Sequence, residues 1–233
     1  MNVVITGASR GFGRSIAEQF GAAGYDLFLC SRDEQRLEAA VKSLQTKFPS
    51  IRVQGNAADL ADKNGINSFS EWVLNLITGV HVLVNNAGSF LPGNVRDEKE
   101  GLLENMMAVN LYSAYHLTRR LLPAMMKQRS GHIFNMCSIA SLNAYANGGA
   151  YSISKFALAG FSKNLREELK QFGIKVTTVY PGAAYTDSWS GSGIDPKRIM
   201  EASDIAKMIF AASQLSSSAC VEDIILRPQL GDL

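Results

Sequence analysis

Residues 3–13 of this 233-residue chain read VVITGASRGFG, and this stretch decides the fold. A short apolar run is followed by a segment that contains three glycines. The pattern RSIAEQFGAAG of residues 14–24 comes directly after it and is typical of an amphipathic helix. Glycines let the backbone turn sharply and approach a pyrophosphate, and the free N–H groups of a helix N-terminus attract its negative charge. A strand, this turn and a helix in that order predict nucleotide binding, with a plain tight turn as the alternative. The residues expected to contact the nucleotide here are Gly7, Ser9, Arg10, Gly11, Phe12 and Gly13.

Short apolar runs alternate with amphipathic stretches along the rest of the chain. The expected strands are Val3–Thr6, Asp26–Cys30, Ile51–Gln54, Val80–Asn85, His132–Met136, Lys175–Tyr180 and Val221–Leu226. The expected helices lie near residues 11–23, 33–47, 62–77, 99–128, 150–172 and 203–214. Parallel strands need long crossovers, usually helices, so this alternation predicts an α/β fold: a doubly wound, parallel, seven-stranded Rossmann-type sheet with helices on both faces.

The stretch from Gly182 to about Ala202 is polar and rich in Gly and Ser, which makes it a poor candidate for core. We expect a mobile flap over the site at about residues 183–202, with an idle surface loop as the alternative. The chain is long enough for one substantial core and short for two, so we expect a single domain spanning residues 1–233.

The composition argues against several classes of partner. A net charge of +2 is too small to indicate nucleic acid or an acidic membrane as the principal partner. The charged fraction of 19% is low, which suggests that another subunit covers part of the surface. Three scattered cysteines, Cys30, Cys137 and Cys220, are typical of a reducing compartment. No apolar run reaches the length of a membrane span and no signal peptide precedes the first strand, so we expect a cytoplasmic protein without a metal site.

Ser138 is followed by Tyr151 and Lys155, thirteen and seventeen positions later. Residues four apart lie on one face of a helix, so the tyrosine and the lysine should be neighbours. A phenol has an ordinary pKa of roughly 10, and a nearby ammonium group stabilises the phenolate and lowers that value. We therefore expect Lys155 to lower the pKa of Tyr151 and make it a proton-transfer group.

The letters Gly7-Ala8-Ser9-Arg10-Gly11 also fit the GxSxG turn of serine hydrolases. Such a hydrolase needs a histidine late in the chain. The histidines are His81, His116 and His132, and none follows in the last hundred residues. The sequence therefore disfavours a hydrolase.

The chain resembles the single-domain short-chain dehydrogenases/reductases. The resemblance rests on Thr6-Gly7 with Gly11 and Gly13, Asp59, Asn85-Asn86-Ala87-Gly88, Asn110, Ser138, Tyr151 with Lys155, and Pro181-Gly182 with Thr186. It implies a dinucleotide-binding domain that transfers hydride between a nicotinamide cofactor and a carbonyl or alcohol.

The resemblance also implies a role for each catalytic position. Tyr151 would donate a proton to the carbonyl oxygen, and Ser138 would hydrogen-bond the same oxygen. Lys155 would bind the ribose hydroxyls of the cofactor. Asn110 would hold a water molecule that connects Lys155 to solvent, unless it is simply a satisfied core amide.

Besides Tyr151 and Lys155, further positions are expected to hold the cofactor. Asn86, Ala87 and Gly88 would let the adenosine half lie close to the backbone. Asp59, with Leu60, would contact the adenine, although Asp59 could instead cap the next helix. Pro181, Gly182 and Thr186 would reach the nicotinamide, although Thr186 could also be a cap.

The end of the second strand bears on the choice of cofactor. An acid there binds the ribose of NAD, whereas cations accommodate the 2′-phosphate of NADP. Ser31 and Arg32 end the strand, and Arg10 lies in the glycine turn. Asp33 could be a ribose-binding acid, but a helix N-cap explains it better. We therefore predict NADP.

The substrate is the least determined part. Candidate wall residues are Ser89, Phe90, Leu91, Asn143, Ala144, Tyr145, Tyr185 and Trp189, mostly aromatic or small, which favours an apolar or planar carbonyl compound. The ending EDIILRPQLGDL is similar to the tails of sepiapterin-reductase-like carbonyl reductases, which favours a ketone, diketone or pterin side chain. The alternatives are a 3-oxoacyl thioester reductase, a dehydratase or epimerase, and a catalytically idle nucleotide sensor.

The family also suggests a homodimer or homotetramer packed through the helices near 99–128 and 150–172.

Overall fold

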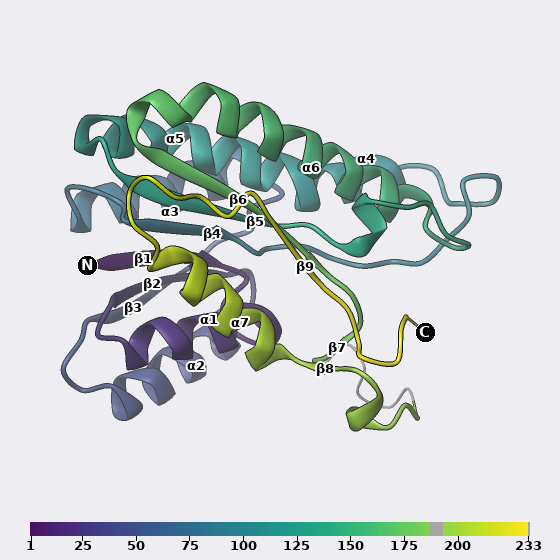
Figure 1. The fold of residues 1–233 in the computed structure, drawn as a ribbon, viewed down its shortest axis with the longest axis horizontal. Coiled ribbons are helices and arrows are strands. Elements are labelled where there is room, and N and C mark those ends of the chain that lie inside the picture. The colour runs from purple at the N-terminus through teal and green to yellow at the C-terminus, as the bar shows by residue number, and fades with distance from the viewer. Residues whose placement is uncertain (187–192, 233) are drawn as a thin grey trace.

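The computed structural model describes residues 1–186 and 193–232 (Figure 1). In these residues a seven-stranded sheet has the order β3-β2-β1-β4-β5-β6-β9. Every neighbouring pair in it is parallel. The strands are β1 (Asn2–Thr6), β2 (Asp26–Ser31), β3 (Val53–Ala57), β4 (Val82–Asn85), β5 (Gly131–Met136), β6 (Ile174–Pro181) and β9 (Asp223–Leu226). The predicted doubly wound sheet is confirmed.

Helices cover both faces of this sheet. The helices α1 (Gly11–Ala22), α2 (Glu34–Lys47) and α7 (Ala202–Ser213) lie on one side of it in Figure 1. The helices α3 (Lys63–Leu76), α4 (Leu102–Met107), α5 (Ser113–Gln128) and α6 (Gly149–Leu169) lie on the other.

The side chains of β1 show why a strand between two helical layers is apolar throughout. Val3 and Ile5 belong to the core under α1 and α7, together with Ile16 and Ile209. Val4 points to the opposite face and belongs to the core under α3, α5 and α6. Successive side chains of a strand alternate between faces, so both faces need apolar residues when both are covered.

Several predicted boundaries are wrong: the strands predicted from Val80 and Val221 begin at Val82 and Asp223, and two larger differences concern the third strand and the helix over 99–128. The third strand is Val53–Ala57 rather than Ile51–Gln54, because the ladder with β2 pairs Leu27 with Val53 and continues to Ser31 and Ala57. The helix predicted over 99–128 is interrupted by a π-helical turn, Ala108–Tyr112, between α4 and α5. Such π turns occur as single turns inside otherwise continuous helices, and the sequence pattern predicted one helix through this one.

The segment predicted as irregular after Gly182 is partly regular. Ala184–Tyr185 (β7) and Met200–Glu201 (β8) pair in parallel, and a 3₁₀ turn spans Pro196–Arg198. The central part of the predicted flap, including Trp189, lies outside the described residues. Among the helices that are described, none has the length and apolar character needed to cross a bilayer.

Candidate active site

The predicted site residues gather at the carboxyl ends of the central strands. The glycine turn follows β1, Asn86 follows β4, Ser138 follows β5 and Gly182 follows β6. Because these strands are parallel, their carboxyl ends share one edge of the sheet. The strand order reverses direction between β1 and β4, the point at which open α/β sheets bind ligands.

The glycine turn is packed too closely for side chains. A Cβ atom on Gly13 would lie 2.2 Å from the carbonyl oxygen of Gly7, and Gly7 has a φ of +63°. The Asn86 amide donates to the carbonyl oxygens of Thr6 at 2.9 Å and Gly7 at 3.0 Å. Asn86 therefore ties the end of β4 to this turn.

The turn fits a phosphate group. Helix α1 begins at Gly11, and the side chain of Arg10 at its N-cap makes no capping hydrogen bond. Its first turn holds no acidic residue either. The first N–H groups of α1, which have no partners within the helix, and its positive end therefore suit an anion, as a dinucleotide would supply.

The groups expected near a ribose 2′-phosphate are close together. The hydroxyl oxygens of Ser9 and Ser31 lie 2.9 Å apart. The side chain of Arg32 is exposed at the end of β2. Asp33 is the N-cap of α2, where its carboxylate accepts a hydrogen bond from the Arg36 backbone N–H at 3.0 Å. The helix-cap interpretation of Asp33 is confirmed.

The two residues predicted to contact adenine lie after β3. The Asp59 carboxylate accepts from the Ala61 backbone N–H at 3.0 Å. The N-cap of α3 is Asp62, so the alternative role of Asp59 as that cap is wrong. Leu60 is 6% exposed and belongs to the core under α3, so little of its side chain is open to a ligand.

Tyr151 and Lys155 are neighbours, as their spacing predicts, and Ser138 joins them from the end of β5. Ser138 hydrogen-bonds the Tyr151 hydroxyl. The Lys155 ammonium lies 5.9 Å from the centroid of the Tyr151 ring. It donates a hydrogen bond of 2.7 Å to the carbonyl oxygen of Met136, the last residue of β5.

The expected lowering of the Tyr151 pKa is wrong for this arrangement. Burial raises the pKa of Tyr151 to about 12, and the hydrogen bond to Ser138 opposes only part of that rise. Lys155 is itself buried, which lowers its own pKa. Its ammonium donates to the Met136 carbonyl oxygen, and burial, the largest influence on Tyr151, sets the direction of the pKa shift of the phenol.

Asn110 lies in the π-helical turn and links two parts of the site. Its Oδ1 atom accepts a hydrogen bond from the Ser89 backbone N–H at 2.8 Å. Its Nδ2 atom donates to the Ser89 carbonyl oxygen at 3.1 Å and to the Ser154 hydroxyl at 2.9 Å. A Cβ on Gly88 would lie 3.0 Å from Asn110 Oδ1 and 3.5 Å from Lys155 Nζ. The described contacts are those of a satisfied core amide; sequence patterns gave no sign of Ser154 as its partner.

The residues after β6 approach the glycine turn. The backbone N–H of Gly182 donates to the Leu226 carbonyl oxygen at 2.8 Å, and Pro181 is buried at the end of the strand. A Cβ on Gly11 would lie 3.5 Å from Thr186 Cγ2. Thr186 thus lies against the start of α1.

One predicted wall residue, Phe90, contacts Tyr151, and most of the others are exposed. The Phe90 ring meets the Tyr151 ring edge-on, with 4.8 Å between centroids. Phe90, Leu91, Tyr145 and Tyr185 are all exposed. Asn143 and Ala144 are exposed as well, and Ser89 is half-buried.

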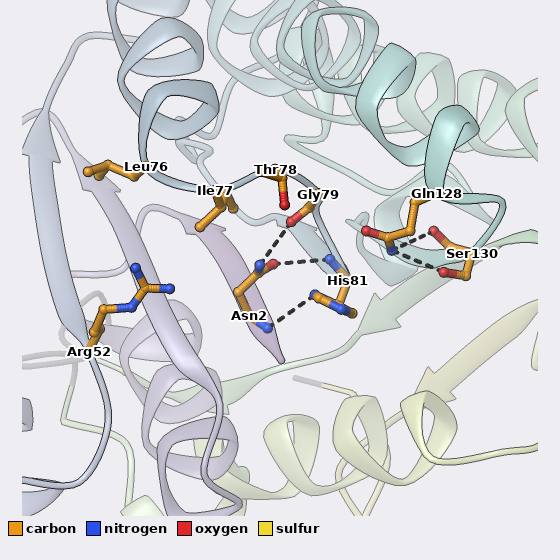
Figure 2. A pocket seen from close by; sticks show the side chains of 9 residues that line it. All are labelled: Asn2, Arg52, Leu76, Ile77, Thr78, Gly79, His81, Gln128 and Ser130. Atoms are coloured by element: carbon orange, nitrogen blue, oxygen red, sulfur yellow. Dashed lines mark hydrogen bonds between the residues drawn. The ribbon is translucent and has the colours of Figure 1, made fainter.

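A separate pocket lies at the other edge of the sheet. Figure 2 shows its lining around Asn2, His81, Gln128 and Ser130, near the amino ends of β1, β4 and β5. Asn2 bonds the Gly79 carbonyl oxygen and His81, and Gln128 bonds Ser130. These polar groups satisfy one another, and the pocket belongs to no part of the candidate site.

This fold and this constellation define an oxidoreductase of the dinucleotide-binding α/β class, and the chain belongs to the short-chain dehydrogenase family. The sequence model described as "short chain dehydrogenase" matches residues 1–195. Sepiapterin reductase of Chlorobaculum tepidum is 32% identical, over 99% of this chain and 97% of that protein.

Solved structures agree. A metagenomic short-chain oxidoreductase in complex with NADP has a TM-score of 0.85 at 32% identity, covering 98% of this chain and 97% of that one. L-sorbose reductase of Gluconobacter frateurii, complexed with NADPH and L-sorbose, has a TM-score of 0.89 at 27% identity, covering 96% of this chain and 94% of that one.

Proposed function

We propose that this protein reduces a small carbonyl compound, a ketone, diketone or pterin side chain, at the expense of NADPH. The observation that carries the proposal is the convergence of Ser138, Tyr151 and Lys155 at the sheet edge that also holds the glycine turn. The bound nicotinamide would supply the hydride that adds to the carbonyl carbon. The residues of the chain supply the proton and its control.

Tyr151 is the proton donor in this proposal. Its raised pKa of about 12 keeps the phenol protonated at neutral pH, which is the form that a reduction consumes. Ser138 hydrogen-bonds the same hydroxyl and is placed to orient the carbonyl oxygen beside it. The buried Lys155 ammonium would stabilise the phenolate left after the proton has moved.

The preference for NADP rests on the groups around the start of α1. Ser9 and Ser31 form a hydroxyl pair beside Arg10 and Arg32, and Asp33 is engaged as a helix cap. A 2′-phosphate would be bound by the cations through charge-assisted hydrogen bonds. The NADP and NADPH complexes of the two similar structures support this preference.

The substrate class rests on the exposed aromatic and aliphatic residues near Tyr151. Phe90 and Tyr145, with Tyr185 from the predicted flap, would form a mainly apolar wall around a small carbonyl compound. The similarity to a sepiapterin reductase supports this class. We also propose that the chain forms one domain, in which residues 183–186 and 193–202 lie over the substrate.

We further propose that the protein assembles as a homodimer or homotetramer. Four large side chains of the π turn, α5 and α6 are exposed: Tyr112 (47%), Tyr115 (37%), Ile153 (42%) and Phe156 (45%). A second copy packed on these helices would remove that apolar surface from water.

Mixing the purified protein with NADPH or NADH and a panel of carbonyl compounds tests the proposal, with the absorbance of reduced nicotinamide as readout. Oxidation of NADPH by several ketones, diketones or pterins is expected. Turnover of 3-oxoacyl thioesters alone would favour that alternative. Tight NADPH binding without turnover of any carbonyl would favour a nucleotide sensor.

A further inference from the structure

Helix α6, which carries both Tyr151 and Lys155, does not cap its own beginning. Gly148 occupies the N-cap position and has no side chain to offer, and the first turn contains no acidic residue. The first N–H groups of a helix need partners from elsewhere, and a negative charge near them is stabilising. Tyr151 is the third residue of α6, so the orientation of this first turn sets the position of the Tyr151 side chain.

Glu98 supplies the missing partner. Its carboxylate accepts a hydrogen bond of 2.8 Å from the Ala150 backbone N–H, across 52 residues of sequence. Glu98 is half-buried, whereas Asp97, Lys99 and Glu100 beside it are exposed. The donor belongs to the residue directly before Tyr151.

The backbone at the start of α6 lies very close to the Glu98 carboxylate. A Cβ on Gly149 would lie 1.9 Å from Glu98 Oε1 and 2.6 Å from the Gly93 carbonyl oxygen. Gly149 has a φ of +35°, which side-chain-bearing residues rarely adopt. Only glycine therefore permits the close approach of residues 93–98 to the start of α6.

Two further hydrogen bonds hold the same pair of segments together. The Gly93 backbone N–H donates to the Asn147 carbonyl oxygen at 3.1 Å. The Asn147 backbone N–H donates to Asn94 Oδ1 at 3.2 Å. Asn147 has a left-handed φ of 61°, so the loop before α6 takes an unfavourable conformation that these contacts maintain. The segment after β4 and the loop before α6 are thus one connected unit.

We propose that Glu98 is a positioning residue for the reaction, one that fixes the first turn of α6 and with it the direction of the Tyr151 hydroxyl. The inference rests on the proposed function, in which Tyr151 is the proton donor. Moving a catalytic group by about 1 Å can lower the reaction rate on the order of 100-fold, even when that group still contacts the substrate. Glu98 itself touches neither substrate nor cofactor in this account.

The test compares Glu98→Ala and Glu98→Gln with the matched control Glu100→Ala, an exposed acid two residues away. Glu98→Ala should lower kcat by about 10- to 100-fold and change the KM for the carbonyl and the Kd for NADPH by less than about threefold. Glu98→Gln should recover most of the loss, because its amide oxygen still accepts from Ala150. Glu100→Ala should behave as the unaltered protein.

Hydrogen–deuterium exchange of the peptide covering residues 145–153 supplies a readout that does not need turnover. Exchange there should be about tenfold faster in Glu98→Ala than in the unaltered protein or Glu100→Ala, with peptides of β1 and β5 unchanged. Normal kcat, or normal exchange at residues 145–153, in Glu98→Ala would overturn the inference. If the unaltered protein reduces no carbonyl, the proposed function has failed, and the exchange comparison still decides whether Glu98 holds the start of α6.

Discussion

The Lys155 ammonium donates to the carbonyl oxygen of Met136, at 2.7 Å, and this bond joins the helix that carries the proposed proton donor to the end of the central strand β5. Burial then controls the titration of the phenol and raises its pKa to about 12. The Tyr151 phenol is therefore protonated at neutral pH.

A first prediction concerns the pH dependence of the two reaction directions. Carbonyl reduction consumes the protonated phenol, so kcat/KM for reduction should stay level through neutral pH and decline only as the pH approaches the Tyr151 pKa of about 12. Alcohol oxidation needs the phenolate and should accelerate as the pH rises. Steady-state rates in both directions check this, and a reduction rate that halves near neutral pH would contradict it.

A second prediction concerns stability in acid. Burial, aided by the charge of Lys175, lowers the pKa of His132 from 6.5 to about 3. The unfolded chain therefore binds a proton in this range while the folded protein does not, so stability is lost as the pH falls from about 6.5 towards 3. His132 alone should make the free energy of unfolding change by up to about 1.4 kcal/mol per pH unit in this range.

Urea titrations at several pH values measure that slope. His132→Asn should flatten it, whereas the same change at His116, whose pKa burial and the charges of Lys63 and Arg119 also lower, should flatten it less. An equal slope in His132→Asn and the unaltered protein would show that other groups dominate.

A third prediction concerns Asn110. Asn110→Ala would leave the Ser89 backbone N–H and the Ser154 hydroxyl without their partner, and Asn110 is only 1% exposed. We expect the free energy of unfolding to fall by about 2 kcal/mol. Asn164→Ala, which removes a single exposed bond to Gly160, should change it by less than about 0.5 kcal/mol. Equal effects in the two variants would mean that the π-helical turn does not depend on Asn110.

A fourth prediction concerns the cofactor. Arg32→Ala removes an exposed cation beside the Ser9 and Ser31 hydroxyl pair. The Kd for NADPH should rise by about tenfold, with little change for NADH, because only NADPH carries the additional phosphate. Arg36→Ala, which removes a cation paired with Asp33, is the control. Equal losses for the two nucleotides in Arg32→Ala would place the phosphate elsewhere.

The parts of the fold that could be predicted are those determined by residues close together in the sequence. The glycine turn is specified by three residues and its flanking strand and helix, and the double covering of the sheet follows from the unbroken apolar character of β1, β2 and β4. The grouping of Tyr151 and Lys155 followed from helix geometry alone.

The parts that could not be predicted depend on contacts between distant segments. The register of β3 is set by its ladder with β2, since Val53 begins a strand whose next residues are exposed. The direction of the Tyr151 pKa depends on burial, which a spacing rule does not contain. The capping of α6 by Glu98 spans 52 residues and has no local signal.

Turnover and NADPH binding by Tyr151→Phe test the central claim most directly. This change removes one hydroxyl and keeps the ring against Phe90. We expect kcat for carbonyl reduction to fall by at least about 100-fold, with the Kd for NADPH within about threefold of the unaltered protein. Tyr112→Phe, at an exposed tyrosine of the π-helical turn, should keep full activity. If Tyr151→Phe reduces carbonyls at an undiminished rate, Tyr151 is not the proton donor.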